Sequence, residues 1–157
     1  MLRHAGYDIV FREIPGEVTL ALNLAGCPHR CPGCHSPHLQ DDAGEALTEG
    51  VLRSLLDAFR HAVTCLCFMG GDAAPRDVMR LAAFARRHMP QGFATAWYSG
   101  RQTPFDGATD CFDYIKLGPY VERLGGLDSP ATNQRLYRVD GTAMTDITAQ
   151  FLNRKVL

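Results

Sequence analysis

The amino-acid sequence predicts an α/β fold, an open partial (β/α) barrel with a mostly parallel sheet. Apolar strand-like runs alternate with segments of helical periodicity, and strand–helix–strand units build parallel sheets through right-handed crossovers. The chain has 157 residues, whereas a closed barrel of this kind takes about 250, so only a partial barrel can form. No repeat or linker divides the chain, so residues 1–157 are expected to form one domain.

Short, nearly apolar runs predict the strands of this sheet. Such runs are typical of strands that are covered on both faces. They lie at residues 18–24, 63–69, 93–98 and 114–117, with a strand-like piece at 9–16 and a further strand expected at 134–139.

Two helices are expected between these strands. The first runs from 49 to 61, where Thr48 is a suitable N-cap and apolar residues recur at three-and-four spacing. The second runs from 75 to 89 and begins with a proline. Residues 101–112 are expected to form a loop or short helix, and residues 145–152 a last helical turn.

Composition and charge exclude several functional classes. The net charge is −1 and no basic stripe is present, so nucleic-acid binding is not expected. No apolar run is long enough to cross a bilayer, and the N-terminus lacks the apolar core of a signal peptide. A cytoplasmic location with reduced thiols is therefore expected. On a strand, Cys65 and Cys67 would be small buried hydrophobes, and Cys111 is expected to be a thiol without a function.

A cysteine-rich loop is the main candidate site. Residues 26–35 read Gly-Cys-Pro-His-Arg-Cys-Pro-Gly-Cys-His, which places Cys27, Cys31 and Cys34 with three and then two residues between them. A structural zinc site takes four protein ligands, and a simple electron-transfer cubane takes four thiolates. Three thiolates on a four-iron cluster leave one iron open to a small molecule. The alternative is a zinc knuckle completed by a nearby histidine: His29, His35 or His38.

Four special loops directly follow four predicted strands. They are the cysteine loop, Gly70-Gly71-Asp72, Ser99-Gly100 and Gly118-Pro119. The carboxyl ends of parallel strands share one edge, where α/β barrels carry their working residues. A Gly-Gly pair alone is usually a plain turn. The coincidence of all four loops indicates a functional rim.

The cysteine loop resembles the signature loop of the radical S-adenosylmethionine (SAM) enzymes. Its amino-acid sequence is similar to that of activating proteins of the anaerobic (class III) ribonucleotide reductase. These proteins also carry a glycine, here Gly33, where many radical SAM enzymes have an aromatic residue. The resemblance extends from about Tyr7 to Leu152 and fits a partial barrel of the radical SAM type. It implies a 4Fe-4S cluster held by Cys27, Cys31 and Cys34.

The resemblance also implies a set of SAM contacts. The backbone of the signature loop would lie along the adenine, the Gly-Gly-Asp loop would bind the methionine amino group, and the loop after the third strand would add a contact. Asp72 stands where related enzymes often have glutamate. In this chain the implied SAM-binding residues are Gly33, Cys34, His35, Gly70, Gly71, Asp72 and Ser99.

The activity implied by the resemblance is the activation of a partner protein. One electron passes through the cluster to SAM, and the resulting 5′-deoxyadenosyl radical takes a hydrogen from a glycine of the anaerobic ribonucleotide reductase. The implied partners are this glycyl radical subunit and a one-electron donor such as flavodoxin or ferredoxin. The irregular segments 101–112 and 118–133 are the expected docking surface.

Two alternative functions stay open. One is a small-molecule radical SAM enzyme of the deazapurine-synthase type, and the other is a non-catalytic iron–sulfur or zinc module. Asp113 and Lys116 lie three apart on a predicted strand and so point to opposite faces, where each is expected to be a solvated or rim charge. Residues 133–135 are similar to a segment of the reductase activases, for which the chemistry suggests no role.

Overall fold

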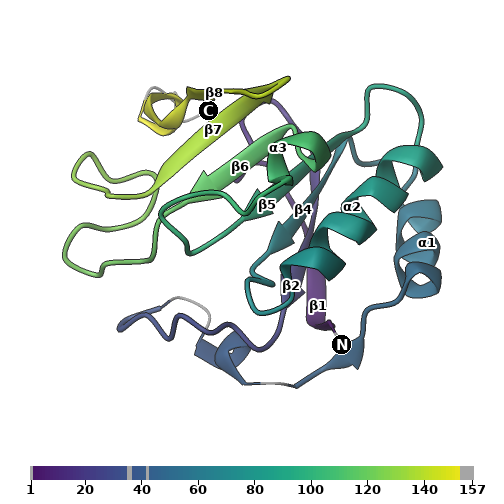
Figure 1. Cartoon of the computed structure of the whole chain (residues 1–157), viewed down its shortest axis with the longest axis horizontal. Coiled ribbons are helices and arrows are strands. Elements are labelled where there is room, and N and C mark those ends of the chain that lie inside the picture. The colour runs from purple at the N-terminus through teal and green to yellow at the C-terminus, as the bar shows by residue number, and fades with distance from the viewer. Residues whose placement is uncertain (1, 35–36, 42, 153–157) are drawn as a thin grey trace.

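A computed structural model describes residues 2–34, 37–41 and 43–152 (Figure 1). Its strands form one sheet in the order β3-β1-β2-β4-β5-β6-β7-β8. The strands are β1 (Arg3–Val10), β2 (Thr19–Leu24), β3 (Glu45–Ala46), β4 (Cys65–Met69), β5 (Ala94–Tyr98), β6 (Tyr114–Leu117), β7 (Arg135–Asp140) and β8 (Ala143–Asp146). The helices are α1 (Glu49–Ala58), α2 (Pro75–His88) and α3 (Ala108–Cys111), with 3-10 turns η1 (Pro37–Gln40) and η2 (Thr148–Phe151).

The centre of the sheet has the predicted topology. β2, β4, β5 and β6 pair in parallel, and a helix lies between each strand and the next along the chain. α1, α2 and α3 cover one face of the sheet (Figure 1). These four strands lie within two residues of the predicted bounds. Thr48 caps α1, because its Oγ1 accepts a hydrogen bond from the Val51 amide at 3.2 Å.

The prediction of a mostly parallel partial barrel is wrong. The sheet is mixed: β1 pairs antiparallel with β2 and β3, and β7 pairs antiparallel with β6 and β8. A parallel connection needs a long crossover, usually a helix. Within the described residues, no helix lies between β6 and β7, so the chain returns antiparallel. α3 is only 4 residues long, which leaves little helix for an outer barrel layer.

The predicted helical turn at 145–152 is also partly wrong. Residues 140 and 143 are paired across a two-residue turn, so β7 and β8 form a hairpin. Gly141 has a φ of +63° in this turn, a conformation that favours glycine. The local Asp-Gly signal therefore closes a hairpin, and only η2 of the expected turn is helical.

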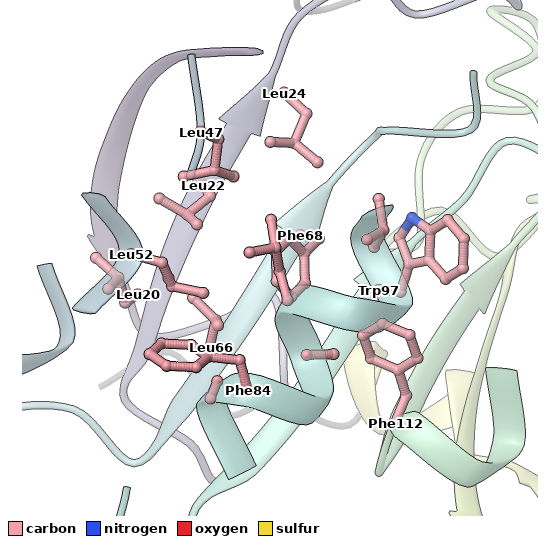
Figure 2. Close-up of a cluster of buried hydrophobic side chains, with 14 of the residues drawn as sticks. Leu20, Leu22, Leu24, Leu47, Leu52, Leu66, Phe68, Phe84, Trp97 and Phe112 are labelled. Atoms are coloured by element: carbon pink, nitrogen blue, oxygen red, sulfur yellow. The ribbon is translucent and has the colours of Figure 1, made fainter. Parts of the chain in front are cut away.

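A hydrophobic core lies between the sheet and the helices (Figure 2). Leu22, Phe68 and Trp97 from three parallel strands pack with helix residues such as Leu52, and all four are almost fully buried. Each such side chain contributes about 1.5–3 kcal/mol when buried. This packing gives the strand ends, and the loops that follow them, a fixed base.

Smaller side chains cover the other face of the central strands. Cys65, Cys67 and Ala96 are fully buried there beneath Ile14, which comes from the β1–β2 connection. The prediction that both cysteines are small buried hydrophobes is confirmed. None of the helices in the described ranges combines the length and apolarity that a bilayer crossing requires.

Candidate functional site

The loops that follow the four parallel strands meet at one edge of the sheet. His29 of the cysteine loop is hydrogen-bonded to Asp72 after β4, and Asp72 also accepts from the Gly100 amide after β5 at 2.8 Å. Lys116 at the end of β6 donates to the carbonyl oxygens of Ser99 and Gly118, each at 3.0 Å. The rim predicted from strand order is therefore present, although the sheet around it is mixed.

Asp72 is the most constrained acid of this rim. Its side chain is only 3% exposed. Its Oδ2 accepts hydrogen bonds from the Ser99 hydroxyl at 3.1 Å, from the Gly100 amide and from His29 Nε2. Its Oδ1 is buried and has no hydrogen-bond partner within the described structure. A buried carboxylate oxygen without a partner is costly, and it suits a bound cation or ammonium group.

Both glycines before Asp72 adopt a positive φ, and close packing also excludes a side chain at Gly71. A Cβ on Gly71 would lie 2.6 Å from Val78 Cγ2 and 2.7 Å from Leu24 Cδ1, and its φ is +91°. The carbonyl oxygen of Gly70 accepts a hydrogen bond from Trp97 Nε1 at 2.7 Å. The core therefore holds this loop from below, and Asp72 takes its position from that packing.

The cysteine loop is tied down at its base and is more open at its tip. The Cys27 amide donates to the Leu39 carbonyl at 2.8 Å, and the Cys34 amide donates to the Cys31 carbonyl at 3.1 Å. All three cysteines are thiols of intermediate exposure. Gly33 has a φ of +71°, and a Cβ there would lie 2.6 Å from the carboxyl carbon of Glu122. The cysteine loop thus contacts the segment that follows β6.

The donor set fits an iron–sulfur cluster in its chemistry. Thiolates are the usual ligands of such clusters. Burial raises the pKa of both Cys65 and Cys67, so neither is a ready thiolate ligand. Among the described side chains, no three of His, Cys, Asp or Glu are grouped closely enough to hold a metal ion. Cluster binding by three thiols therefore requires the cysteine loop to draw them together, as metal binding commonly orders its own site.

Lys116 is a rim residue whose environment sequence reasoning missed. It is 8% exposed, and its ammonium lies 5.6 Å from the centre of the Tyr98 ring. Burial lowers its pKa to about 8, and the charges of Asp72 and Cys31 partly oppose that effect. The expectation is a solvated or rim charge: Lys116 lies at the rim, but it is buried instead of solvated, because β6 is an inner strand of the sheet. A lysine within the apolar run Tyr-Ile-Lys-Leu was the available signal.

Asp113 has a structural environment on the helix side of the sheet. Its carboxylate forms an ion pair with Arg86 at 3.0 Å and accepts from the Thr95 amide at 2.9 Å. It is therefore fixed to α2 and β5, away from the rim lysine, as the opposite-face prediction required. Of residues 133–135, the first two lie in the β6–β7 connection, where Asn133 Nδ2 donates to the Pro119 carbonyl at 3.0 Å, and Arg135 begins β7.

The remaining predicted SAM contacts have separate outcomes. Ser99 is only 1% exposed. Its hydroxyl donates a hydrogen bond to Asp72 and so orients the acid. His35 lies outside the described residues. The direct contact between His29 and Asp72 had no sequence signal, because the two residues lie 43 positions apart. Only the tertiary structure brings them together.

Comparison with known proteins agrees with the chemistry of this loop. A family model described as a 4Fe-4S single cluster domain matches residues 15–104. The match spans more than half of the chain and includes the cysteine loop, the Gly-Gly-Asp loop and Ser99-Gly100. Searches of curated proteins and of solved structures each gave no match. The chain belongs to the family of 4Fe-4S single cluster domains.

Proposed function

We propose that this chain is a radical SAM activating enzyme that installs a glycyl radical on the anaerobic ribonucleotide reductase. The observation that carries the proposal is the pairing of a three-cysteine loop with the unpartnered Oδ1 of Asp72 at the same rim. Three thiolates leave one iron of a 4Fe-4S cluster without a protein ligand. The buried carboxylate oxygen offers an anchor for an ammonium group beside it.

The residues of the rim have distinct roles in this proposal. Cys27, Cys31 and Cys34 would hold the cluster, and Asp72 Oδ1 would accept from the amino group of SAM. The Ser99 hydroxyl and the Gly100 amide keep Asp72 in that orientation. A bound and reduced cluster would supply the one electron that cleavage of SAM into methionine and a 5′-deoxyadenosyl radical requires.

The partner would approach from the segment that follows β6. Residues 118–133 lie on the same side of the molecule as the cysteine loop (Figure 1), and Glu122 contacts Gly33 directly. Arg123 and Asp128 are exposed in this segment. A glycine of a second protein that docks there would lie next to the rim, which suits activation of a protein substrate. An electron donor such as flavodoxin or ferredoxin would serve the same cluster.

A non-catalytic iron–sulfur module is the second candidate. The family match indicates cluster binding, and a module that binds a cluster without catalysis is sufficient to account for it. His29 is hydrogen-bonded to Asp72, so the acid can also be understood as an anchor for the cysteine loop. In that case Asp72 would have a structural role and would bind no ligand.

Anaerobic assay of 5′-deoxyadenosine separates these candidates. The protein is reconstituted with iron and sulfide and then given SAM and a strong reductant. Cys31→Ala removes a proposed ligand, and Cys111→Ala is the matched control at a cysteine outside the loop. Asp72→Asn keeps the shape of the acid and removes its charge. We expect product from the wild type and Cys111→Ala, none from Cys31→Ala, and weaker SAM binding by Asp72→Asn.

The other outcomes have definite meanings. A four-iron cluster with no product, even with the reductase present, would favour the non-catalytic module. Product without activation of the reductase would favour a small-molecule radical SAM enzyme. One zinc per chain and no cluster would contradict both the proposal and its iron–sulfur alternative.

A further inference from the structure

We propose that Lys116 is a positioning charge for the cluster: its buried ammonium, which a chain of hydrogen bonds connects to the cysteine loop, sets the reduction potential of the cluster. This role is separate from SAM binding. It rests on the cluster that the family match indicates and on the environment of one side chain. It applies equally to a radical SAM enzyme and to an electron-transfer module.

A continuous chain of contacts connects Lys116 with the cysteine loop. The ammonium donates to the Ser99 carbonyl, and the Ser99 hydroxyl donates to Asp72. Asp72 is hydrogen-bonded to His29, which lies between Cys27 and Cys31 in the sequence. The lysine is therefore connected to the cysteine loop through Ser99, Asp72 and His29. It is shielded from water, since only 8% of its surface is exposed.

The two hydrogen bonds of the ammonium do not neutralise its charge. Both acceptors are uncharged backbone carbonyls, of Ser99 and Gly118. Asp72 is the first of the charges that raise the pKa of Lys116, followed by Cys31, with Cys27 further down the same order. These charges favour the protonated amine, and its pKa of about 8 leaves it mostly cationic at neutral pH.

A buried positive charge stabilises the more negative state of a nearby redox centre. Reduction adds one electron to a cluster that already carries sulfide and thiolate charges, so the reduced form gains more from Lys116 than the oxidised form does. Charge and hydrogen bonding around a cluster are known determinants of its potential. Solvent screens surface charges strongly and buried charges much less. Lys116 should therefore outweigh any exposed arginine.

The test is an anaerobic redox titration of the reconstituted protein, followed by electron paramagnetic resonance. Lys116→Gln keeps a donor for the carbonyls and removes the charge, and Lys116→Arg keeps the charge. Lys116→Met removes both the charge and the donor. Arg87→Met is the matched control, because it removes one exposed positive charge on α2. Iron content and circular dichroism confirm that each variant is folded and loaded.

We expect Lys116→Gln and Lys116→Met to disfavour reduction by at least tenfold, which is about 59 mV for a one-electron couple. Lys116→Arg and Arg87→Met should stay near the wild-type potential. If Lys116→Met fails to fold, Lys116→Gln alone decides. A wild-type potential in Lys116→Gln overturns the inference and assigns the lysine to hydrogen bonding only.

The potential and the SAM assay fail independently. A lowered potential in Lys116→Gln, with no 5′-deoxyadenosine from the wild type, would support the role of Lys116 and contradict the proposed enzyme. An unchanged potential in Lys116→Gln, with full SAM cleavage by the wild type, would contradict the role of Lys116 and support the proposed enzyme. A wild-type protein that assembles no cluster would overturn both.

Discussion

At the scale of single residues, the His29 side chain connects the cysteine loop to the other loops of the rim. It is hydrogen-bonded to Asp72, and its ring lies against the bare Cα of Gly100. A Cβ on Gly100 would come within 2.5 Å of the ring at Cδ2. The backbone of Gly100 needs no positive φ, so this ring contact is the reason for a glycine there.

We therefore predict that Gly100→Ala acts by displacing His29. The variant should lose the His29–Asp72 hydrogen bond and about 1 kcal/mol of stability, and His29→Ala should lose a similar amount. The double variant should be no less stable than either single variant, because the ring that meets the new methyl group is gone. Chemical denaturation of the four proteins measures this coupling. Additive losses would contradict the contact, and Gly126→Ala, which makes no close contact, is the control.

The pH dependence of stability should reveal the burial of Lys116. Below about pH 8 the amine is charged in both the folded and the unfolded chain, so the cost of burying its charge is fully present. Between about 8 and the ordinary value of 10.5, the folded chain releases the proton first. The unfolded chain then binds more protons, so stability rises with pH in this window.

The measured quantity is the free energy of unfolding of the cluster-free wild type minus that of Lys116→Met. This difference should rise by roughly 3 kcal/mol from pH 7.5 to pH 10.5. A flat or falling difference would mean that the lysine is not held in a buried, desolvated position.

At the scale of elements, one polar cluster fastens α2 to β5 and to the start of β6. Arg86 of α2 donates to the Thr95 hydroxyl at 3.1 Å and to the Asp110 carbonyl at 3.0 Å, and it pairs with Asp113. Asp113 in turn accepts from the Thr95 amide. These contacts fix the helix on the sheet from the side opposite the rim.

Asp113→Asn should therefore destabilise the fold without altering the rim. Because both side chains are partly exposed, we expect a loss of about 1 kcal/mol. Thermal unfolding measures the loss, and the iron content after reconstitution should equal that of the wild type. A fully stable variant with a lower iron content would instead assign Asp113 to the cluster site.

The segment after β6 gives an element-scale test of partner docking. Its Glu122 contacts Gly33, so a deletion of residues 121–130 would disturb the cysteine loop as well as the surface. Reversal of an exposed charge is cleaner. Arg123→Glu should leave 5′-deoxyadenosine formation unchanged and lower glycyl radical yield on the reductase severalfold, with Arg87→Glu on α2 as the control. Equal radical yields would place docking elsewhere.

At the scale of the whole molecule, the family match covers only part of the main hydrophobic core. It ends at residue 104, whereas Phe112, Ile115 and Leu117 from the following segment belong to the main core. β6 also pairs with β5 along its edge and carries Lys116. The matched region therefore lacks part of its own core and one residue of the rim.

A chain that ends at residue 104 is predicted not to fold by itself. Removing the later strands would expose Trp97, which stacks on Phe105 at 5.1 Å and packs near Phe112. It would also leave β5 as an unpaired edge. We expect loss of the near-ultraviolet circular dichroism and of a cooperative melting transition. A cooperative transition in the truncated chain would show that residues 105–157 are an addition to a complete domain.

The sequence by itself determined the four parallel strands, the two main helices and the identity of the cysteine loop. These features depend on local patterns: apolar runs, helical periodicity, a cap at Thr48 and the spacing of three cysteines. The buried positions of Cys65 and Cys67 follow from the same strand pattern. The family match bears out the iron–sulfur interpretation, and the SAM contacts stay a proposal.

The tertiary structure alone decided the direction of the outer strands and the composition of the rim. The direction of β1 and β7 depends on which neighbour each strand meets, and no local pattern records that. The contact of His29 with Asp72 and the burial of Lys116 join residues far apart in the chain. Such contacts depend on how several loops pack together, because each loop alone leaves its polar groups to water.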